Sequence, residues 1–282
     1  MTRLRVFRGN QAGGELRDYE VQAGEGSVVL DAVHMIQAQQ APDLAVRWNC
    51  KAGKCGSCSA EINGKPKLMC MTRMSDYAPD ETITVTPMRA FPVIKDLVTD
   101  VSWNYKVNER IPAFQPRKPD APDGTWRMYQ YEVERPQEFR KCIECFLCQD
   151  VCHVLRTHEK HEQFMGPAML VRAAVYEMHP LDEADRRQHL RHEGGIGYCN
   201  ITKCCTEVCP ESITITDNAI IPLKERVIDQ NYDPLAALLR KLVGKGDEGR
   251  GRGEEDVAWQ VEAPPQMSTP VRSLGSRLAR TG

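Results

Sequence analysis

The sequence lacks a long apolar run and lacks any segment that resembles a secretory signal. The amino-terminal stretch MTRLRVFRGNQAGGELRDYEV has neither an apolar core nor a small-residue cleavage site. No later window reaches ~18 uninterrupted apolar residues, the length that a membrane-spanning helix needs. These absences predict a cytosolic chain that does not span a membrane.

An excess of charge of one sign is also lacking. Lysine and arginine total 37 against 39 for aspartate and glutamate, which gives a formal net charge of -2. Proteins that bind nucleic acid through its phosphates present a basic field, and this composition supplies none. The sequence therefore predicts no nucleic-acid partner.

The length of 282 residues is too great for one small domain and suits two compact domains with a tail. Four prolines among few large apolar residues predict an extended connector. The predicted organisation is a first domain at 1–105, a connector at 106–124, a helical domain at 125–244 and a mobile polar tail at 245–282. The tail is rich in Gly, Glu, Arg and Pro, a composition that cannot bury enough surface to become ordered.

The first domain has the pattern of a small mixed sheet packed on one helix. Two strands joined by a turn are predicted within 4–21, and further strands at 59–62 and 82–86. Ser27 stands as the predicted N-cap of the helix between them.

Beyond the connector the pattern becomes helical. Gly166-Pro167 opens one predicted helix, because proline fits the first helical position. A second is predicted from Asp182 to His192, and a third begins at Asp233-Pro234.

The sequence contains twelve cysteines, and their spacing is its most informative feature. A reducing compartment does not favour disulfides, so metal ligation is the preferred interpretation. The first group reads C-x4-C-x2-C, with a fourth cysteine after eleven more residues, which is typical of a plant-type 2Fe-2S cluster. Zinc is the alternative, although zinc sites favour two C-x2-C pairs. The predicted 2Fe-2S ligands are Cys50, Cys55, Cys58 and Cys70.

One ferredoxin motif is used twice in the second half of the chain. The first run, at 142–152, reads C-x2-C-x2-C-x3-C, and the second, at 199–210, reads C-x2-T-x2-C-x3-C-P. In the bacterial ferredoxin arrangement, the fourth cysteine of each run ligates the cluster of the other run. That exchange predicts a 4Fe-4S cluster held by Cys142, Cys145, Cys148 and Cys209. It leaves the neighbouring cluster with Cys152, Cys199 and Cys205.

The neighbouring cluster has three thiolates where a cubane needs four. Thr202 stands in the place of the missing cysteine, and a neutral hydroxyl is a poor ligand for iron of this kind. A 3Fe-4S cluster is therefore predicted. Cys204 precedes Cys205 and is an alternative ligand, but the motif spacing favours Cys205 and the simplest interpretation of Cys204 is a small buried residue.

These motifs resemble the iron-sulfur subunit of succinate dehydrogenase and fumarate reductase over about 4–243. The resemblance implies an α+β chain in which an N-terminal β-grasp, plant-type ferredoxin domain is followed by an all-α, bacterial-ferredoxin-like domain. Local strings agree with the family as well: Arg47-x-x-Cys50, Cys55-Gly56-Ser57-Cys58, Ile62-Asn63-Gly64, Gly166-Pro167-Ala168 and Cys209-Pro210.

The resemblance also implies the function and the partners. In this family a flavoprotein subunit carrying FAD oxidises succinate, and electrons pass singly through 2Fe-2S, 4Fe-4S and 3Fe-4S clusters to quinone at a membrane-anchor subunit, with or without haem. The implied role is a non-catalytic electron-transfer subunit, peripheral to the cytoplasmic face of the cell membrane. A fumarate reductase has the same cysteine set, and a soluble ferredoxin-like carrier for another dehydrogenase is the alternative from another class.

Two polar residues flank ligands of the predicted third cluster. Many relatives place Pro and then a Trp pair after the fourth cysteine of the first run, whereas this chain has His153 there. His153 and Asn200 are candidates for contact with quinone or for a proton relay. A solvent-facing or interface role is an equally simple interpretation.

Overall fold

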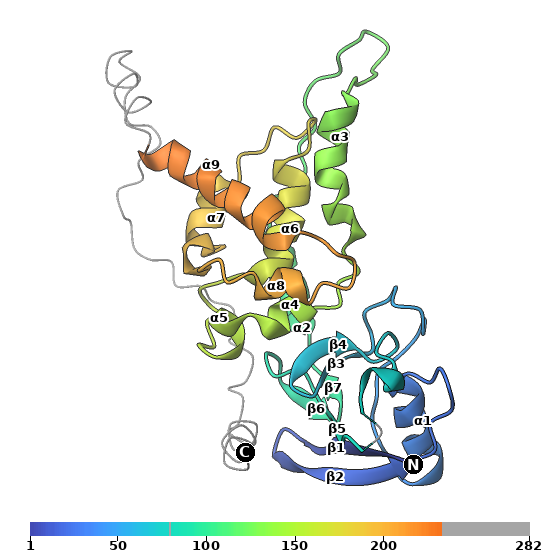
Figure 1. The fold of residues 1–282 in the computed structure, drawn as a ribbon. Coiled ribbons are helices and arrows are strands. Elements are labelled where there is room, and N and C mark those ends of the chain that lie inside the picture. The colour runs from blue at the N-terminus through green and yellow to red at the C-terminus, as the bar shows by residue number, and fades with distance from the viewer. Residues whose placement is uncertain (79, 233–282) are drawn as a thin grey trace.

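The computed structural model describes residues 1–78 and 80–232, which form a sheet lobe followed by a helical lobe (Figure 1). The sheet is mixed: β1 pairs antiparallel with β2 and parallel with β5, and the strand order is β4-β3-β5-β1-β6-β7. The predicted hairpin and strands are confirmed. The strands are β1 (Thr2–Asn10), β2 (Gly13–Val21), β3 (Ser59–Ile62), β4 (Lys65–Leu68), β5 (Ile83–Thr86), β6 (Val93–Lys95) and β7 (Val98–Thr99).

One helix, α1 (Val29–Gln39), packs on the sheet as predicted, and it buries an apolar stripe that includes Val33 and Ile36. Ser27 is not its N-cap, so that prediction is wrong. Val28 occupies the cap, and its amide donates to the carboxylate of Asp31 at 3.1 Å. The amides of Val29 and Leu30, which a Ser27 cap would have satisfied, donate instead to the carbonyls of Thr72 and Met69 at 2.9 and 3.1 Å.

The second lobe is helical, as the sequence predicted. It begins with α2 (Ser102–Asn108), which ends inside the predicted connector, and the predicted helix at Gly166 is confirmed as α6 (Gly166–Glu177). The other helices are α3 (Gln130–Gln137), α4 (Leu147–Val151), α5 (His153–Arg156), α7 (Arg187–His192), α8 (Cys204–Glu207) and α9 (Ile221–Tyr232). Short 3-10 turns η1 (Met74–Asp76), η2 (Phe139–Lys141) and η3 (Ile196–Tyr198) and a π-helical segment η4 (Ile215–Ile220) complete the elements.

The helix predicted from Asp182 begins later, at Arg187. Asp182 is held in a turn instead: its carboxylate accepts from the amide of Gln115 at 3.2 Å and from the guanidinium of Arg186 at 2.8 Å. The carboxylate thus links the connector to the helical lobe and is not free to cap a helix. The local sequence does not reveal these distant partners. The helix predicted from Asp233 and the tail at 245–282 lie outside the described residues.

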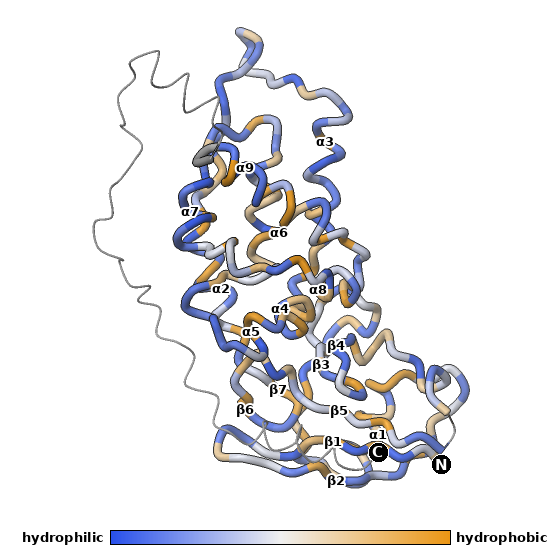
Figure 2. Tube along the Cα trace, turned by 60° about the vertical axis from the view of Figure 1, so that its left-hand side comes forward, coloured by the Kyte–Doolittle hydropathy of each residue, from blue (hydrophilic) through white to orange (hydrophobic). Residues whose placement is uncertain are grey.

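Buried apolar side chains form one continuous cluster that extends from Leu4 in the sheet lobe to Val227 in α9. The chain trace is apolar around α4 and α6 and hydrophilic along α3 and the loop before it (Figure 2). α4 and α2 lie where the two lobes meet (Figure 1). Between residues 1 and 232, leaving out residue 79, no helix combines the length and apolarity that crossing a bilayer requires.

Candidate iron-sulfur sites

Three cysteines of the first group lie on the loop between α1 and β3, the fourth follows β4, and backbone amides point at their sulfur atoms. The amides of Ala52 and Lys54 donate to Cys50 Sγ at 3.4 and 3.3 Å, and the amide of Cys70 donates to Cys58 Sγ at 3.4 Å. Amide donors to thiolate sulfur stabilise the charge of a bound cluster and raise its reduction potential. The amide donors therefore suit a loop whose cysteine sulfurs bind a metal cluster.

The loop reaches this shape through left-handed backbone conformations. Lys51, Gly53 and Gly56 have φ of 55°, 67° and 68°, values that glycine adopts without steric cost. The hairpin of β3 and β4 then brings Cys58 and Cys70 together, because Ser59 pairs with Leu68 in its register. The structure thus assembles the four cysteines that the spacing predicted for the 2Fe-2S cluster.

The thiols of this group differ in acidity. Burial raises the pKa of Cys58 to about 12, and the neighbouring Cys70 adds to the rise. At Cys55 burial acts in the same direction, but hydrogen bonds from Cys50 and Ser57 outweigh it and lower the pKa to about 6. A buried thiol such as Cys58 becomes a thiolate readily only when a bound cation replaces its proton.

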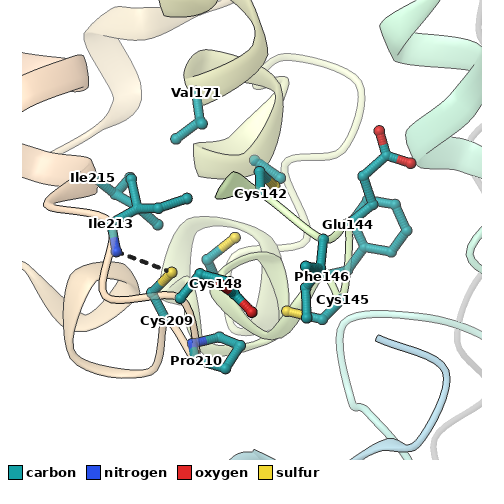
Figure 3. Close-up of a pocket in the computed structure, with 13 residues that line it drawn as sticks. Cys142, Glu144, Cys145, Phe146, Cys148, Val171, Cys209, Pro210, Ile213 and Ile215 are labelled. Atoms are coloured by element: carbon teal, nitrogen blue, oxygen red, sulfur yellow. Dashed lines mark hydrogen bonds between the residues drawn. The ribbon is translucent and has the colours of Figure 1, made fainter. Parts of the chain in front are cut away.

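The second cysteine group lines a pocket with side chains that come from both ferredoxin runs (Figure 3). Cys142, Cys145 and Cys148 come from the first run and Cys209 from the second. The amide of Ile213 donates to Cys209 Sγ at 3.4 Å. The pocket encloses about 390 Å³, including the part open to solvent, and its other walls are mainly apolar, with Val171 and Ile215 among them. The structure thus brings together the four residues that the exchange rule grouped.

Burial dominates the chemistry of this second pocket. It raises the pKa of Cys145 to about 12 and that of Cys148 well above its usual range, and the neighbouring thiols add to both shifts. The buried thiols of Cys145 and Cys148 are costly to ionise separately, whereas an iron core offsets their charge. The donor set and its apolar walls fit a four-iron cluster.

The amino terminus of α6 is fixed against α4 behind Cys148. Gln149 donates to Asn104 Oδ1 at 3.0 Å and to the carbonyl of Met165 at 3.1 Å. Gly166 has φ of 77°, and a Cβ there would lie 2.0 Å from Gln149 Oε1. The Gly166-Pro167 signal therefore does more than open a helix, because it lets α6 approach the cysteine loop.

The third group gathers around α8 and the carboxyl end of α4. Cys152 and Cys205 are buried and Cys199 is half-buried, and Cys205 Sγ lies 3.5 Å from Thr216 Oγ1. Burial raises the pKa of Cys152 to about 11, with the thiols of Cys204 and Cys205 adding to the rise. The charge of Cys199 also acts on Cys205, so the three predicted ligands are neighbours. Cys204 lies beside them and is half-buried, not buried as expected from the sequence.

The backbone repeats its conformation in the two ferredoxin runs. Glu144 and Phe146 have φ of 54° and 60°, and Ile201 and Lys203, at the matching places of the second run, have 61° and 63°. A short helix follows each pair, α4 in the first run and α8 in the second. This match gives Thr202 the place that Cys145 holds in the first run.

No three His, Cys, Asp or Glu side chains within the described ranges converge closely enough to hold one metal ion. The ligands of a multi-iron cluster stand further apart, since inorganic sulfide lies between the irons. This spacing differs from the tetrahedral set of a structural zinc site, the alternative raised by the sequence.

The first two groups meet where the lobes pack together. A Cβ on Gly56 would lie 2.6 Å from the Cα of Cys145. The hydroxyl of Ser59 lies 2.8 Å from the carbonyl of Gly56 and 2.9 Å from that of Cys145, and donates to them. The loop of the first group therefore rests directly on the backbone of the second.

A buried charged network beside this contact was missed by sequence reasoning. Glu61 on β3 is fully buried, with one oxygen 3.0 Å from Arg89 Nε and the other 2.7 Å from Arg156 Nη2 on α5. Asp150 on α4 is also fully buried and accepts from the amide of Ala90 at 3.0 Å. Burial, with the charge of Glu61 adding, raises the pKa of Asp150 to about 8.

His153 and Asn200, the residues singled out beside the third group, are in contact. Asn200 Nδ2 lies 2.7 Å from His153 Nε2. Asn200 is exposed and His153 is half-buried, so a molecule docked against this side of the third group can reach the pair.

Comparison with known proteins agrees with this arrangement. Residues 3–106 match a 2Fe-2S iron-sulfur cluster binding domain, and residues 138–213 match a 4Fe-4S dicluster domain. The fumarate reductase iron-sulfur subunit of Mycobacterium tuberculosis is 35% identical over 202 residues, covering 69% of this chain and 79% of that protein. The predicted 2Fe-2S and 4Fe-4S domains are confirmed.

Two further relatives extend the comparison. A chain of the solved Mycobacterium smegmatis Sdh1 complex in the apo form is 64% identical with a TM-score of 0.80, and the match covers 83% of this chain and 98% of that one. One subunit of the fumarate reductase (CoM/CoB) of Methanothermobacter marburgensis is 29% identical over 89% of this chain, which spans only 50% of that relative.

Proposed function

The chain belongs to the family of iron-sulfur subunits of succinate dehydrogenase and fumarate reductase, and we propose that it conducts electrons through 2Fe-2S, 4Fe-4S and 3Fe-4S clusters in that order. When bound, these clusters supply one-electron chemistry that couples a two-electron substrate reaction to quinone. The observation that carries the proposal is the pocket that gathers Cys142, Cys145 and Cys148 with Cys209 (Figure 3). Cysteines of two runs share one pocket because the runs exchange their fourth ligands.

The order of the sites is supported by two contacts. Gly56, between ligands of the first site, packs on Cys145 of the second. Cys205 of the third site is near enough to Cys148 for its charge to add to the rise in the Cys148 pKa. The first site therefore lies against the second, and the second lies near the third, as a single-file path requires.

The three-iron form of the last cluster is proposed from Thr202. In the proposed ligand set Cys152, Cys199 and Cys205 hold the cluster, and the threonine fills the place of a fourth thiolate. Lys224 adds a positive charge, since its Nζ donates to the carbonyl of Cys199 at 2.6 Å. Fewer ligand charges and a nearby cation both raise the reduction potential, which suits donation to quinone.

The proposed partners follow from the family. A flavoprotein subunit with FAD would deliver electrons at the first site, and a membrane-anchor subunit, with or without haem, would hold quinone beside the third. The chain would then be peripheral to the cytoplasmic face of the cell membrane. His153 and Asn200 are proposed to lie near that quinone. The 64% identity to the Sdh1 chain favours succinate oxidation over fumarate reduction.

The exchange of ligands can be tested with Cys209→Ser and Cys205→Ser in the intact complex. Paramagnetic resonance with redox titration should show three clusters in the wild type. Cys209→Ser should perturb the 4Fe-4S signal and leave the 3Fe-4S signal, and Cys205→Ser should do the reverse, while both keep the 2Fe-2S signal as evidence of folding. Zinc without acid-labile sulfide, or loss of the same signal in both variants, would contradict the proposal.

A further inference from the structure

The third site contains a fourth thiol in addition to the three proposed ligands. Cys204 opens α8, and its Sγ lies 3.3 Å from Thr202 Oγ1. Its charge also acts on Cys152 and Cys205, which come from different runs and are both buried. Cys204 is therefore in contact with the threonine and lies near the two ligands.

The repeated backbone explains why this contact matters. Thr202 has the place that Cys145, a proposed ligand, has in the first run, so its hydroxyl marks the corner of the third site that lacks a thiolate. Cys204 corresponds to Leu147 of the first run, which is buried and apolar. The second run thus lacks a thiol at one place and has an extra thiol within contact of it.

We propose that Cys204 serves as an additional ligand, so that the third site takes up a fourth iron when it is reduced and ferrous iron is available. This inference rests on the proposed 3Fe-4S cluster. The one-electron-reduced three-iron core carries no net charge, and addition of one ferrous ion gives a four-iron core of charge 2+ without further electron transfer. The Cys204 thiol releases its proton to water as its sulfur bonds to the new iron.

The test uses the intact complex, reduced with dithionite and incubated without oxygen with isotopically labelled ferrous iron. Mössbauer spectra then report only the added iron, and paramagnetic resonance after mild reoxidation reports the remaining three-iron cluster. The wild type should incorporate labelled iron and lose most of its three-iron signal. Cys204→Ala and Cys204→Ser should incorporate about tenfold less. Glu207→Gln, at an exposed residue of the same helix α8, should behave as the wild type.

The outcomes separate this inference from the proposed function. A three-iron signal that ferrous iron leaves unchanged, or equal incorporation in Cys204→Ala, overturns the inference and leaves the three-iron assignment intact. A complex that holds four irons at this site as purified overturns that assignment. If the purified complex holds four irons, a three-iron signal that appears in Cys204→Ala supports Cys204 as a ligand. A Cys204→Ala spectrum identical to that of the wild type overturns that role. The 2Fe-2S signal checks that each variant is folded.

Discussion

Gly56 packs against Cys145 where the cysteine groups of the two lobes meet, and an alanine there would clash. Its φ is 68°, and the new Cβ would lie 2.6 Å from the Cα of Cys145. Gly64 is a matched control, because its φ is 75° and a Cβ there meets nothing within 4 Å. Gly64→Ala should cost about 1–2 kcal/mol for the backbone strain alone.

Gly56→Ala should cost roughly 1–3 kcal/mol more than the control, since the clash is with backbone that must shift. Urea unfolding measures the difference, and rapid-reaction spectroscopy of the complex should show slower electron transfer from the first site to the second. Equal costs at the two glycines would contradict the close packing that we describe.

Thr202→Cys restores the thiolate that the second run lacks. The variant should convert the third cluster to a 4Fe-4S form and lower its potential by an amount on the order of 100 mV, since one more ligand charge favours the oxidised state. Redox titration followed by paramagnetic resonance measures both. If the Thr202→Cys variant contained enough iron for a four-iron cluster and still gave the wild-type three-iron signal, Thr202 would not be at the open corner.

Spacing predicted the cysteine groups because a cluster restricts which positions along a loop can reach it. The charged residues of the lobe junction had no such signal. Glu61 and Arg156 are far apart in the sequence, and each reads locally as a surface charge, yet they form an ion pair with the glutamate fully buried. The burial of Glu61 follows from the packing of the two lobes, which no local pattern encodes.

At the scale of elements, that ion pair joins a strand of one lobe to a helix of the other. Arg156→Met would leave the half-exposed Arg89 as the cation paired with Glu61. Breaking a buried pair costs about 3–5 kcal/mol, and we expect roughly 2–4 kcal/mol here because Arg89 remains. Urea unfolding measures it, with Arg5→Met at the exposed Arg5–Asp18 pair as a control that should cost less than about 1 kcal/mol.

The double variant Arg156→Met, Glu61→Gln gives a second check. Removing the carboxylate charge should recover part of the stability lost in Arg156→Met, because the uncompensated buried charge is then gone. No recovery would mean that the arginine acts through packing of its aliphatic stem and not through the ion pair.

The elements that were predicted well have strong local signals. The Asn63-Gly64 turn marked the end of β3, alternating side chains marked β5, and Pro167 marked α6. The predictions that failed depended on distant partners. Asp182 reads locally as a helix start, yet its carboxylate binds Gln115 and Arg186. The helix α9 was not predicted, although Pro222 stands at its start.

At the scale of the whole molecule, His161 joins the lobes. Its Nε2 lies 2.9 Å from the carbonyl of Ala90, and its ring packs edge-on against Trp103 of α2 at 4.9 Å. Burial lowers the pKa of His161, against opposing hydrogen bonds to the backbone of Ala90 and Glu159. The folded state therefore binds fewer protons than the unfolded state as pH falls through about 6.5.

This histidine should make the free energy of unfolding decrease as the solution is acidified through that range. His161→Phe should have a smaller decrease between about pH 7 and 6, measured by urea unfolding at a series of pH values. His158→Phe, at an exposed histidine, is the control and should keep the wild-type slope. Identical slopes in all three proteins would remove His161 as the source.

The sequence predicted two compact domains, and the two lobes are present. Their buried apolar residues nevertheless form one cluster, since Phe146 of the helical lobe and Phe91 of the sheet lobe pack at 6.3 Å. Composition marks a proline-rich connector but does not reveal how tightly the flanking lobes associate. The domain limits at 105, 124 and 244 remain predictions.

The shared pocket of the two ferredoxin runs has a consequence for biosynthesis. In the proposed ligand assignment, the first cluster site is complete once translation has passed Cys70, whereas both later sites need residues 199–209. A nascent chain that stops before Cys199 can mature only at its amino-terminal end. The iron of the two later clusters must be inserted after nearly the whole described chain has been made. By then the 2Fe-2S site can already have received its cluster.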